Sequence, residues 1–263
     1  MKFERAKLNP WLKGVEALPR EESEPRAQAG LREILKNDFF SYARFALGYH
    51  DLNWPTHGET IRLYESLATR KIDVLPRGTF KSSLGCVAYP MWRLERDPDL
   101  TILLDSEIFN NSKNFIREIK AHYNSDKYRS VFGLRIGEKW GESEITVAPR
   151  VRNRKEASIT AGGIGTVKIG QHYDLIVGDD YNSPANSDTP EKCQKVIDHV
   201  RYNLNILNPS GEYVFIGTRY AERDVLGFLL KDILGESKLA EGKMELSLTR
   251  ELKNDGLLFE GAL

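Results

Sequence analysis

Asp73-Val-Leu-Pro-Arg-Gly-Thr-Phe-Lys-Ser-Ser83 is the stretch that says most about the fold of this chain. The apolar run that ends at Pro76 has the length of a buried strand, and residues 84–96 can form a helix. A strand, a glycine-containing loop, a Lys-Ser pair and a helix follow one another as in a phosphate-binding loop. In such a loop, backbone N–H groups and a helix N-terminus face an anion.

Two positions of this stretch depart from the general pattern G-x-x-x-x-G-K-[ST]. Phe80 stands where the pattern has the glycine before the lysine, and Leu75 stands where it has the first glycine. A plain surface turn after a strand is therefore an equal alternative. In the phosphate-loop interpretation, the residues that surround the phosphates are Arg77, Gly78, Thr79, Phe80, Lys81, Ser82 and Ser83.

A second stretch, Tyr173-Asp-Leu-Ile-Val-Gly-Asp-Asp180, is an apolar run that ends in two adjacent carboxylates. The run is too short for a helix, so it predicts a buried strand with Asp179 and Asp180 at its C-terminal end. Open α/β sheets bind their ligands at that end. One carboxylate there can hold Mg²⁺ and the next can orient an attacking water. Two solvated aspartates in a turn are the alternative.

The alternation of apolar runs and amphipathic segments predicts an α/β fold. Buried strands over 72–75, 100–104, 173–180 and 213–216 each precede a helical segment, which favours a mostly parallel sheet with helices on both faces. The phosphate loop, the two aspartates and Gly217-Thr-Arg219 would then gather along one edge. The other expected elements are an extended arm over 1–30, helices over 31–47, 54–67, 84–96, 108–123, 189–204 and 224–234, and strands over 145–147, 157–160 and 244–248.

Composition excludes several classes of protein. Lys+Arg 38 against Asp+Glu 38 gives a net charge of zero, so any contact with DNA has to be local or shared among subunits. The two cysteines and five histidines form no metal-ligand spacing, and two cysteines suit a reducing compartment. The sequence lacks an apolar run of 18 residues and the apolar core of a signal peptide, so we expect a soluble, intracellular protein.

Two smaller features carry open alternatives. Trp54-Pro-Thr-His57 lies upstream of the phosphate loop, where a polar-aromatic cluster often contacts the adenine base; a capping Thr56 and a packed Trp54 are equally expected. A basic turn with Arg150, Arg152, Arg154 and Lys155 joins the two short strands near residue 150, where a solvated hairpin tip is the simpler interpretation. Gly162, Gly163 and Gly165 then suggest a flexible approach to the carboxylate strand.

Taken together, these motifs resemble the ATPase domain of a tailed-bacteriophage large terminase, the motor that packages DNA into a procapsid. The resemblance covers about residues 38–258 and rests on Pro76-Arg-Gly-x-x-Lys-Ser82, on Asp174-Leu-Ile-Val-Gly-Asp-Asp180 and on Ile216-Gly-Thr-Arg219. Terminases use a shortened loop with an arginine before the glycine. The departures from the general pattern are therefore points of agreement with this family.

The resemblance implies a P-loop NTPase core of the RecA-like (ASCE) type that binds ATP and Mg²⁺. Lys81 and Ser82 would contact phosphates and Mg²⁺ with Asp179, Arg77 would lie against the γ-phosphate, and Thr218 would couple hydrolysis to movement. Many relatives have glutamate where this chain has Asp180, so Glu191 is the alternative base that activates water. The implied domains are an arm with a helical lid over 1–55, the core over 56–250, and the start of a linker over 251–263 to a nuclease domain not included here.

Ring motors often complete each ATP site with a cation from the next subunit. Arg150 and Lys168 are the first candidates for this trans-acting residue, Arg152 and Arg154 are further ones, and Arg77 is the competitor within the same subunit. The partners implied are double-stranded DNA, a portal ring, a small terminase subunit and further copies of the chain in a ring on the procapsid. We expect a monomer in isolation, no membrane, the cytoplasm of an infected host cell, and no nuclease activity.

Three other functions fit part of the pattern. A helicase core would have two tandem motor domains, whereas this chain holds one. A P-loop kinase would need an acceptor-binding lid and would not need paired carboxylates at a strand end. A non-hydrolysing scaffold is the fourth hypothesis, against which the retention of Lys81, Ser82, Asp179 and Asp180 together argues.

Overall fold

The structure is a computed structural model that describes residues 20–76, 78–166, 170–218, 220, 224–229 and 244–248. The candidate site residues Arg77 and Lys168 lie outside these ranges, as does Arg219. No helix among the described residues is both long enough and apolar enough to cross a membrane.

Helices and strands are interspersed along the described part of the chain. They are α2 (Arg20–Asn37), α3 (Phe39–Ser41), the π-helical turn η1 (Tyr42–Ala46), α4 (Trp54–Glu65), β1 (Arg70–Val74), the π-helical turn η2 (Ser83–Ala88), α5 (Tyr89–Arg96), β2 (Ile102–Ser106), α6 (Phe109–Asn124), α7 (Asp126–Phe132), β3 (Ile136–Trp140), β4 (Glu144–Val147), β5 (Ile159–Ala161), β6 (Tyr173–Asp179), α8 (Pro190–Asn205), β7 (Leu207–Gly217), α9 (Val225–Phe228) and β8 (Met244–Leu248).

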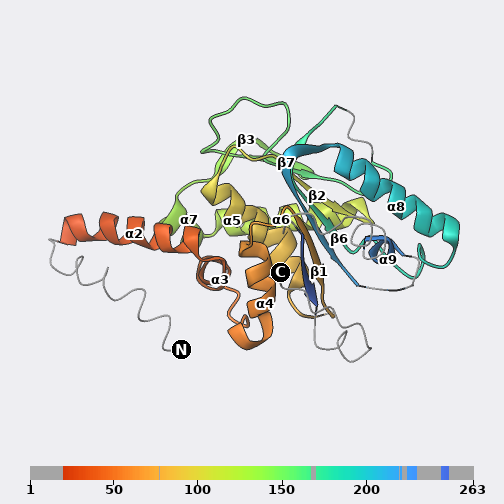
Figure 1. Ribbon diagram of the computed structural model, residues 1–263. Helices are drawn as coiled ribbons and strands as arrows, with labels where there is room; N and C mark the ends of the chain where they lie inside the picture. Colours follow the sequence, from red (N-terminus) through yellow and green to blue (C-terminus); the bar gives the residue numbers. More distant parts are fainter. Residues whose placement is uncertain are drawn as a thin grey trace.

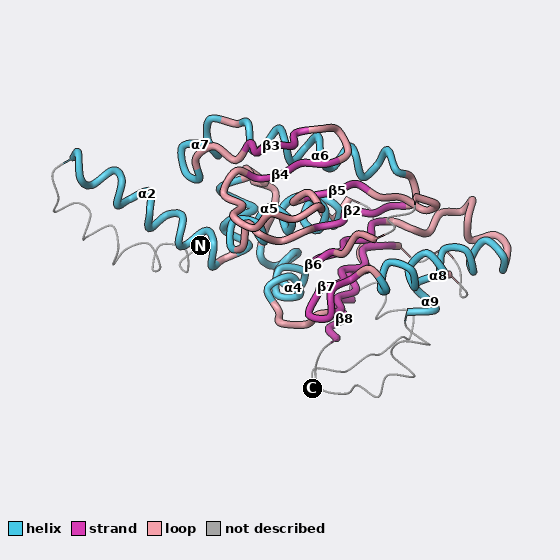
Figure 2. The backbone as a smooth tube through the Cα atoms, turned by 90° about the horizontal axis from the view of Figure 1, so that it is seen from above, coloured by secondary structure: helices cyan, strands magenta, loops and turns pink. Residues whose placement is uncertain are grey.

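The strands of the described residues form one twisted sheet with the order β3-β4-β5-β2-β6-β7-β1-β8 (Figure 2). The pairs from β5 to β8 are parallel, and β3 and β4 add an antiparallel edge. The strand before the phosphate loop, β1, is separated from the carboxylate strand β6 by β7. This is the strand order of the P-loop NTPase core of the ASCE type, and the predicted fold class is confirmed.

Each face of the sheet carries its own apolar core, with α4, α5 and α6 on one face and α8 and α9 on the other (Figure 1). Successive side chains of a strand point to opposite faces. In β6, Leu175 and Val177 therefore join the first core and Ile176 joins the second. Both faces of the central strands are covered, which explains why they read as continuous apolar runs in the sequence.

The N-terminal segment differs from expectation, because α2 already begins at Arg20, within the part expected to be extended. The helix expected over 31–47 is broken at Asp38, whose carboxylate accepts from the Ser41 N–H at 2.7 Å and caps the next helix. Leu35 and Phe39 lie in the same core as the sheet. The packing of a helix against a core stabilises it more than its own propensity does. The charged residues and prolines of this segment indicated an extended chain and gave no sign of that packing.

Two short elements, α7 and β3, were not predicted. α7 begins at a Ser125 cap that accepts from the Tyr128 N–H, and its 7 residues are too few for a clear periodic signal. β3 is half-exposed and lies at the sheet edge, so it lacks an apolar run. The strands expected over 145–147, 157–160 and 244–248 are present as β4, β5 and β8, while the domain boundaries at residues 55 and 250 stay predictions.

Gly85 generates a stability prediction, because η2 packs directly on the sheet at this residue. A Cβ at Gly85 would lie 2.1 Å from Cδ1 of Ile216 and 2.3 Å from the hydroxyl of Tyr64, and both neighbours are buried. We expect Gly85→Ala to lower the free energy of unfolding by about 1–3 kcal/mol through overpacking, measured by urea denaturation.

Gly58→Ala is the matched control. A Cβ there would approach only the ring of Trp54, at 3.2 Å, and that ring is 45% exposed and can shift. The helix propensity of alanine favours this change by up to about 1 kcal/mol. Equal stabilities of the two variants would show that η2 does not pack as described.

Candidate functional site

Three parallel strands end side by side at the edge where the predicted site residues lie. Val74 of β1 is in register with Gly217 of β7, and Asp179 of β6 is in register with Ile216. The residues that follow these strand ends are therefore brought together although they lie about a hundred residues apart in the sequence. The predicted gathering of the loop, the Asp-Asp pair and Thr218 at one edge is confirmed.

Lys81 connects all three strand ends. Its Nζ donates to Oγ1 of Thr218 at 2.6 Å, to the carbonyl of Leu75 at 3.3 Å and to Oδ1 of Asp180 at 3.4 Å. Only 6% of its side chain is exposed. A buried ammonium group held by several oxygens can exchange some of them for phosphate oxygens without being moved into water.

Ser82 and Asp179 form the second contact between the loop and the carboxylate strand. The Ser82 hydroxyl donates to Oδ1 of Asp179 at 2.8 Å. The pKa of Asp179 is raised from 3.8 to about 7, mainly by burial and then by the charge of Asp180, with the Ser82 hydroxyl and Lys81 acting in the opposite direction. A carboxylate in this setting gains from a nearby cation, which would stabilise its ionised form.

The Ser82–Asp179 pair fits Mg²⁺ but not a metal that needs a protein cage. The described residues contain no group of three or more His, Cys, Asp or Glu side chains that could hold a metal ion. Mg²⁺ is usually held by one or two protein oxygens together with substrate phosphates and water. One hydroxyl and one carboxylate at the end of a phosphate loop match that requirement.

Asp180 has a different setting from Asp179. Its side chain is 37% exposed, and its backbone adopts a positive φ of 41°, held by an N–H donated to the Ile216 carbonyl at 2.9 Å. The carboxylate therefore faces both Lys81 and solvent, as a group that orients water requires. Glu191, the alternative base, lies exposed in the first turn of α8.

The phosphate loop contains two residues in the left-handed region. Gly78 has φ 81° and Phe80 has φ 61°. A Cβ at Gly78 would meet no atom within 4 Å, so the backbone angle and not space calls for glycine there. For Phe80 the same region costs about 1–2 kcal/mol. The Thr79 hydroxyl donates to the Pro76 carbonyl at 2.7 Å and closes the turn between them.

The upstream aromatic residues take two different places. His57 is buried and its ring lies edge-on against Phe80 of the loop, 5.8 Å between centroids. The Trp54 ring is half-exposed, packs edge-on against Phe40 and has the Arg62 guanidinium 5.2 Å above it. The helix cap is Asn53 and not Thr56, because the Asn53 side chain accepts from the Thr56 N–H. The contact of Trp54 and His57 with a base stays a prediction.

A buried polar network beside the site was not found from the sequence. Oδ2 of Asp105 contacts the Tyr181 hydroxyl at 2.8 Å, Nε2 of His199 at 2.6 Å and Nδ2 of Asn203 at 2.6 Å. The network ties the residue after Asp180 to β2 and α8. The four-residue spacing of His199 and Asn203 on one helix face was the available signal.

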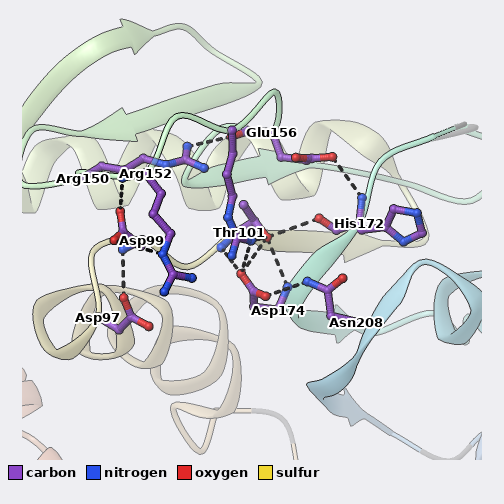
Figure 3. A network of polar contacts seen from close by, with 10 residues as sticks. Asp97, Asp99, Thr101, Arg150, Arg152, Glu156, His172, Asp174 and Asn208 are labelled. Atoms are coloured by element: carbon purple, nitrogen blue, oxygen red, sulfur yellow. Dashed lines mark hydrogen bonds and ion pairs between the residues drawn. The ribbon is translucent and has the colours of Figure 1, made fainter.

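The basic turn lies at the opposite, amino-terminal edge of the sheet (Figure 3). Arg154 donates to Oδ2 of Asp174 at 2.8 Å, at the start of β6, and Arg150 donates to the Glu156 carbonyl at 2.7 Å. The expectation of a solvated tip is therefore wrong for these two half-buried arginines, because ion pairing and hydrogen bonding hold them against the sheet.

The outer part of the same turn is ordered by one carboxylate. Oδ1 of Asp99 accepts from the backbone N–H groups of Val151 and Arg152 at 2.8 and 2.7 Å, and Figure 3 shows Arg152 beside Asp99. The side chains of Val151 and Arg152 point outward and are mostly exposed. Because the phosphate loop of the same chain lies at the other edge, an arginine of this turn can serve only another subunit, and that role stays a prediction.

The glycines before the carboxylate strand also correct an expectation. Gly162 and Gly163 are buried, and a Cβ at Gly163 would lie 2.7 Å from the backbone nitrogen of Phe109. Close packing, not flexibility, requires glycine at these positions: the backbone of Phe109 lies against Gly163, and the side chains of Asp105 and Leu103 lie against Gly162. Gly165 alone is exposed and has a positive φ, of 89°.

Comparisons with known proteins add little to this geometry. No protein-family model and no curated protein matches the chain. Two similar solved structures are of a Dbp5 variant from S. cerevisiae, one bound to Nup159, a Gle1 variant, IP6 and ADP, and the other to a Gle1 variant and IP6. The first has 13% identity and a TM-score of 0.48 over 81% of this chain and 52% of that chain; the second has 14% and 0.43 over 71% and 45%.

This chain thus spans about half the length of the chains it matches. The assignment of the P-loop NTPase fold rests on the strand order and on the contacts of Lys81 and Ser82.

Asp73 is a further carboxylate of the site region, buried in β1 beneath the loop. Its Oδ2 accepts from the Tyr64 hydroxyl at 3.0 Å, and its Oδ1 has no hydrogen-bond partner. Burial raises the pKa of Asp73 from 3.8 to about 7; the Tyr64 hydroxyl and the charge of Lys81 oppose this, and Asp179 adds to it. The folded chain therefore holds the proton more tightly than the unfolded chain.

This difference predicts a pH-dependent stability. The contribution of Asp73 to the free energy of unfolding is fully present below its unfolded pKa of 3.8 and is lost as the pH rises to about 7. Relative to Asp73→Asn, which keeps an acceptor for Tyr64, the wild-type chain should lose about 2 kcal/mol from about pH 5.5 to about pH 7.5. Urea denaturation at several pH values measures this. A difference that does not change with pH would show that Asp73 is ionised throughout.

Proposed function

We propose that this chain is a Mg²⁺-dependent ATPase that drives movement along double-stranded DNA, as the motor domain of a large terminase does. One observation carries the ATPase part. Lys81 and Ser82 of the phosphate loop contact Thr218, Asp180 and Asp179, which follow or end two neighbouring strands. The loop sequence Pro76-Arg-Gly-x-x-Lys-Ser82 and the position of Thr218 support the terminase part.

The residues divide the work of hydrolysis among them. The Lys81 ammonium, already held at the meeting point of the strands, would stabilise negative charge on the terminal phosphate. The half-exposed carboxylate of Asp180 would orient the attacking water. Ser82 and Asp179 would hold Mg²⁺, which would supply positive charge against the phosphates of a bound nucleotide.

Thr218 is the residue through which the nucleotide would act on the rest of the chain. Its hydroxyl is bonded to Lys81, and it follows β7 directly. A phosphate that draws Lys81 away would break this contact and release the Thr218 hydroxyl. The partners of such a motor, which we include in the proposal, are a portal ring, a small terminase subunit and further copies of the chain in a ring.

The first test separates the roles of three residues. We expect Lys81→Ala to lower the rate of ATP hydrolysis by about 100-fold or more, because the transition-state charge loses its cation. Asp180→Asn should bind nucleotide normally and lose hydrolysis by roughly 100-fold or more. Asp179→Asn should instead weaken the Mg²⁺ dependence of nucleotide binding. Phosphate release and binding of a fluorescent ATP analogue measure the two properties.

Lys113→Ala is the matched control for Lys81→Ala, because Lys113 lies on α6 and pairs with the exposed Glu142. Its hydrolysis rate should equal that of the wild-type chain. Full activity of Lys81→Ala with an unchanged melting curve would overturn the ATPase proposal. Full activity of Asp180→Asn would transfer the role of base to Glu191 or another residue.

The second test addresses the nucleic acid, since the same geometry also serves a helicase core. We expect double-stranded DNA to raise the hydrolysis rate severalfold more than single-stranded DNA or RNA, with no rise in Lys81→Ala. Displacement of a third strand from a DNA triplex would report translocation. Preferential stimulation by RNA or single-stranded DNA, with unwinding of a duplex, would favour the helicase core instead.

A further inference from the structure

We propose that Tyr49 and His57 clamp the ring of Phe80 and thereby hold the phosphate loop in its binding conformation. In the general loop pattern, glycine at this position adopts that conformation without strain. We call these three residues the aromatic clamp. The proposal rests on the proposed function of the loop as a nucleotide site and identifies the residues that position it.

Phe80 occupies a backbone conformation that its own chemistry disfavours. Its φ is 61°, in the left-handed region where glycine is at ease and a residue with a Cβ is strained. It immediately precedes Lys81, and its carbonyl accepts from the Leu84 N–H at 2.8 Å. A rotation at Phe80 would therefore shift Lys81 and break the first bond of the helical segment that follows the loop.

Strain of this kind persists only where the surroundings hold the residue in place. The ring centroid of Phe80 lies 6.0 Å from that of Tyr49 and 5.8 Å from that of His57, at interplanar angles of 48° and 89°. These contacts come from two different segments, the turn after η1 and the helix α4. The Phe80 side chain thus has neighbours that would be lost if its backbone moved to a negative φ.

The two clamping rings are themselves fixed. The Tyr49 hydroxyl donates to Oε1 of Glu118 at 3.0 Å, and its ring packs edge-on against His122, 5.6 Å away. Both of these partners lie on α6. His57 is buried on α4, and its Nδ1 lies within hydrogen-bond distance of the backbone of Asn53. The clamp is therefore anchored to rigid helices on both sides.

The clamp has a measurable consequence for binding. If the loop leaves its binding conformation for part of the time, the apparent Kd for nucleotide rises by the inverse of the competent fraction. Loss of a clamping ring should lower the binding-competent fraction only in chains whose residue 80 has a Cβ and is therefore strained. Glycine at position 80 removes the strain and should make the clamp unnecessary.

The first measurement compares two substitutions at Phe80 by the Kd of a fluorescent, non-hydrolysable ATP analogue with Mg²⁺. We expect Phe80→Ala, which keeps the Cβ and loses the ring, to weaken binding by roughly tenfold. Phe80→Gly loses the ring as well but also the strain, and should bind within about threefold of the wild-type chain. Equal weakening by both substitutions would overturn the proposal, because the ring itself and not the backbone would then be what matters.

The second measurement is a double-mutant cycle. Tyr49→Ala should weaken nucleotide binding in the wild-type chain but not in Phe80→Gly. Tyr49→Phe should bind nucleotide more tightly than Tyr49→Ala does, because it keeps the ring. Phe115→Ala, a half-buried aromatic residue of the same core on α6, controls for a general loss of stability. A Tyr49→Ala effect of equal size in both backgrounds would make Tyr49 a structural residue only and overturn the clamp.

A readout without nucleotide separates failure of the clamp from failure of the proposed function. Hydrogen exchange in a peptide covering residues 75–84 should be faster in Tyr49→Ala and in Phe80→Ala than in the wild-type chain, since the Leu84 N–H loses its partner. Unchanged exchange in both variants would overturn the clamp. If exchange rises as expected but Lys81→Ala hydrolyses ATP at the rate of the wild-type chain, the clamp stands and the ATPase assignment is wrong.

Discussion

The buried ammonium group of Lys81 is the point on which the site depends. It joins the loop after β1 to Thr218 after β7 and to Asp180 after β6, and only 6% of the side chain reaches solvent. An unpaired charge in such a place would be costly, so these oxygens have to stay within reach of Nζ. The parallel register of the three strands provides this, because it brings their carboxyl ends to one edge.

The carboxylates around Lys81 differ in their surroundings, and this divides their roles. Asp73 and Asp179 are buried, and burial raises the pKa of each to about 7. Asp180 is more exposed and lies in a turn with positive φ. A carboxylate that gains from a cation and a carboxylate that can reach water therefore stand next to each other. Adjacent residues at a strand end achieve this because their side chains point in different directions.

The two edges of the sheet carry different kinds of polar chemistry. At the carboxyl edge the polar groups are arranged around a loop that can exchange partners. At the amino edge Arg150, Arg152 and Arg154 are held by hydrogen bonds and ion pairs, so the basic turn has a defined shape with Val151 and Arg152 at its exposed tip. The basic turn and the loop that carries Lys81 therefore lie at opposite edges of the sheet.

Local patterns in the sequence were enough to predict the central strands, the phosphate loop and the position of the Asp179–Asp180 pair. Strands that are buried on both faces are continuous apolar runs, and the polar residues that end such a run mark the end of the strand. The ion pair of Arg154 with Asp174 and the contact of Asp105 with His199 join residues that are 20 and 94 positions apart, and a local pattern does not identify such partners. The same holds for Phe80. Its departure from glycine is visible in the sequence, but only the tertiary structure places Tyr49 and His57 against its ring, because contacts between distant segments decide which strained conformation can persist.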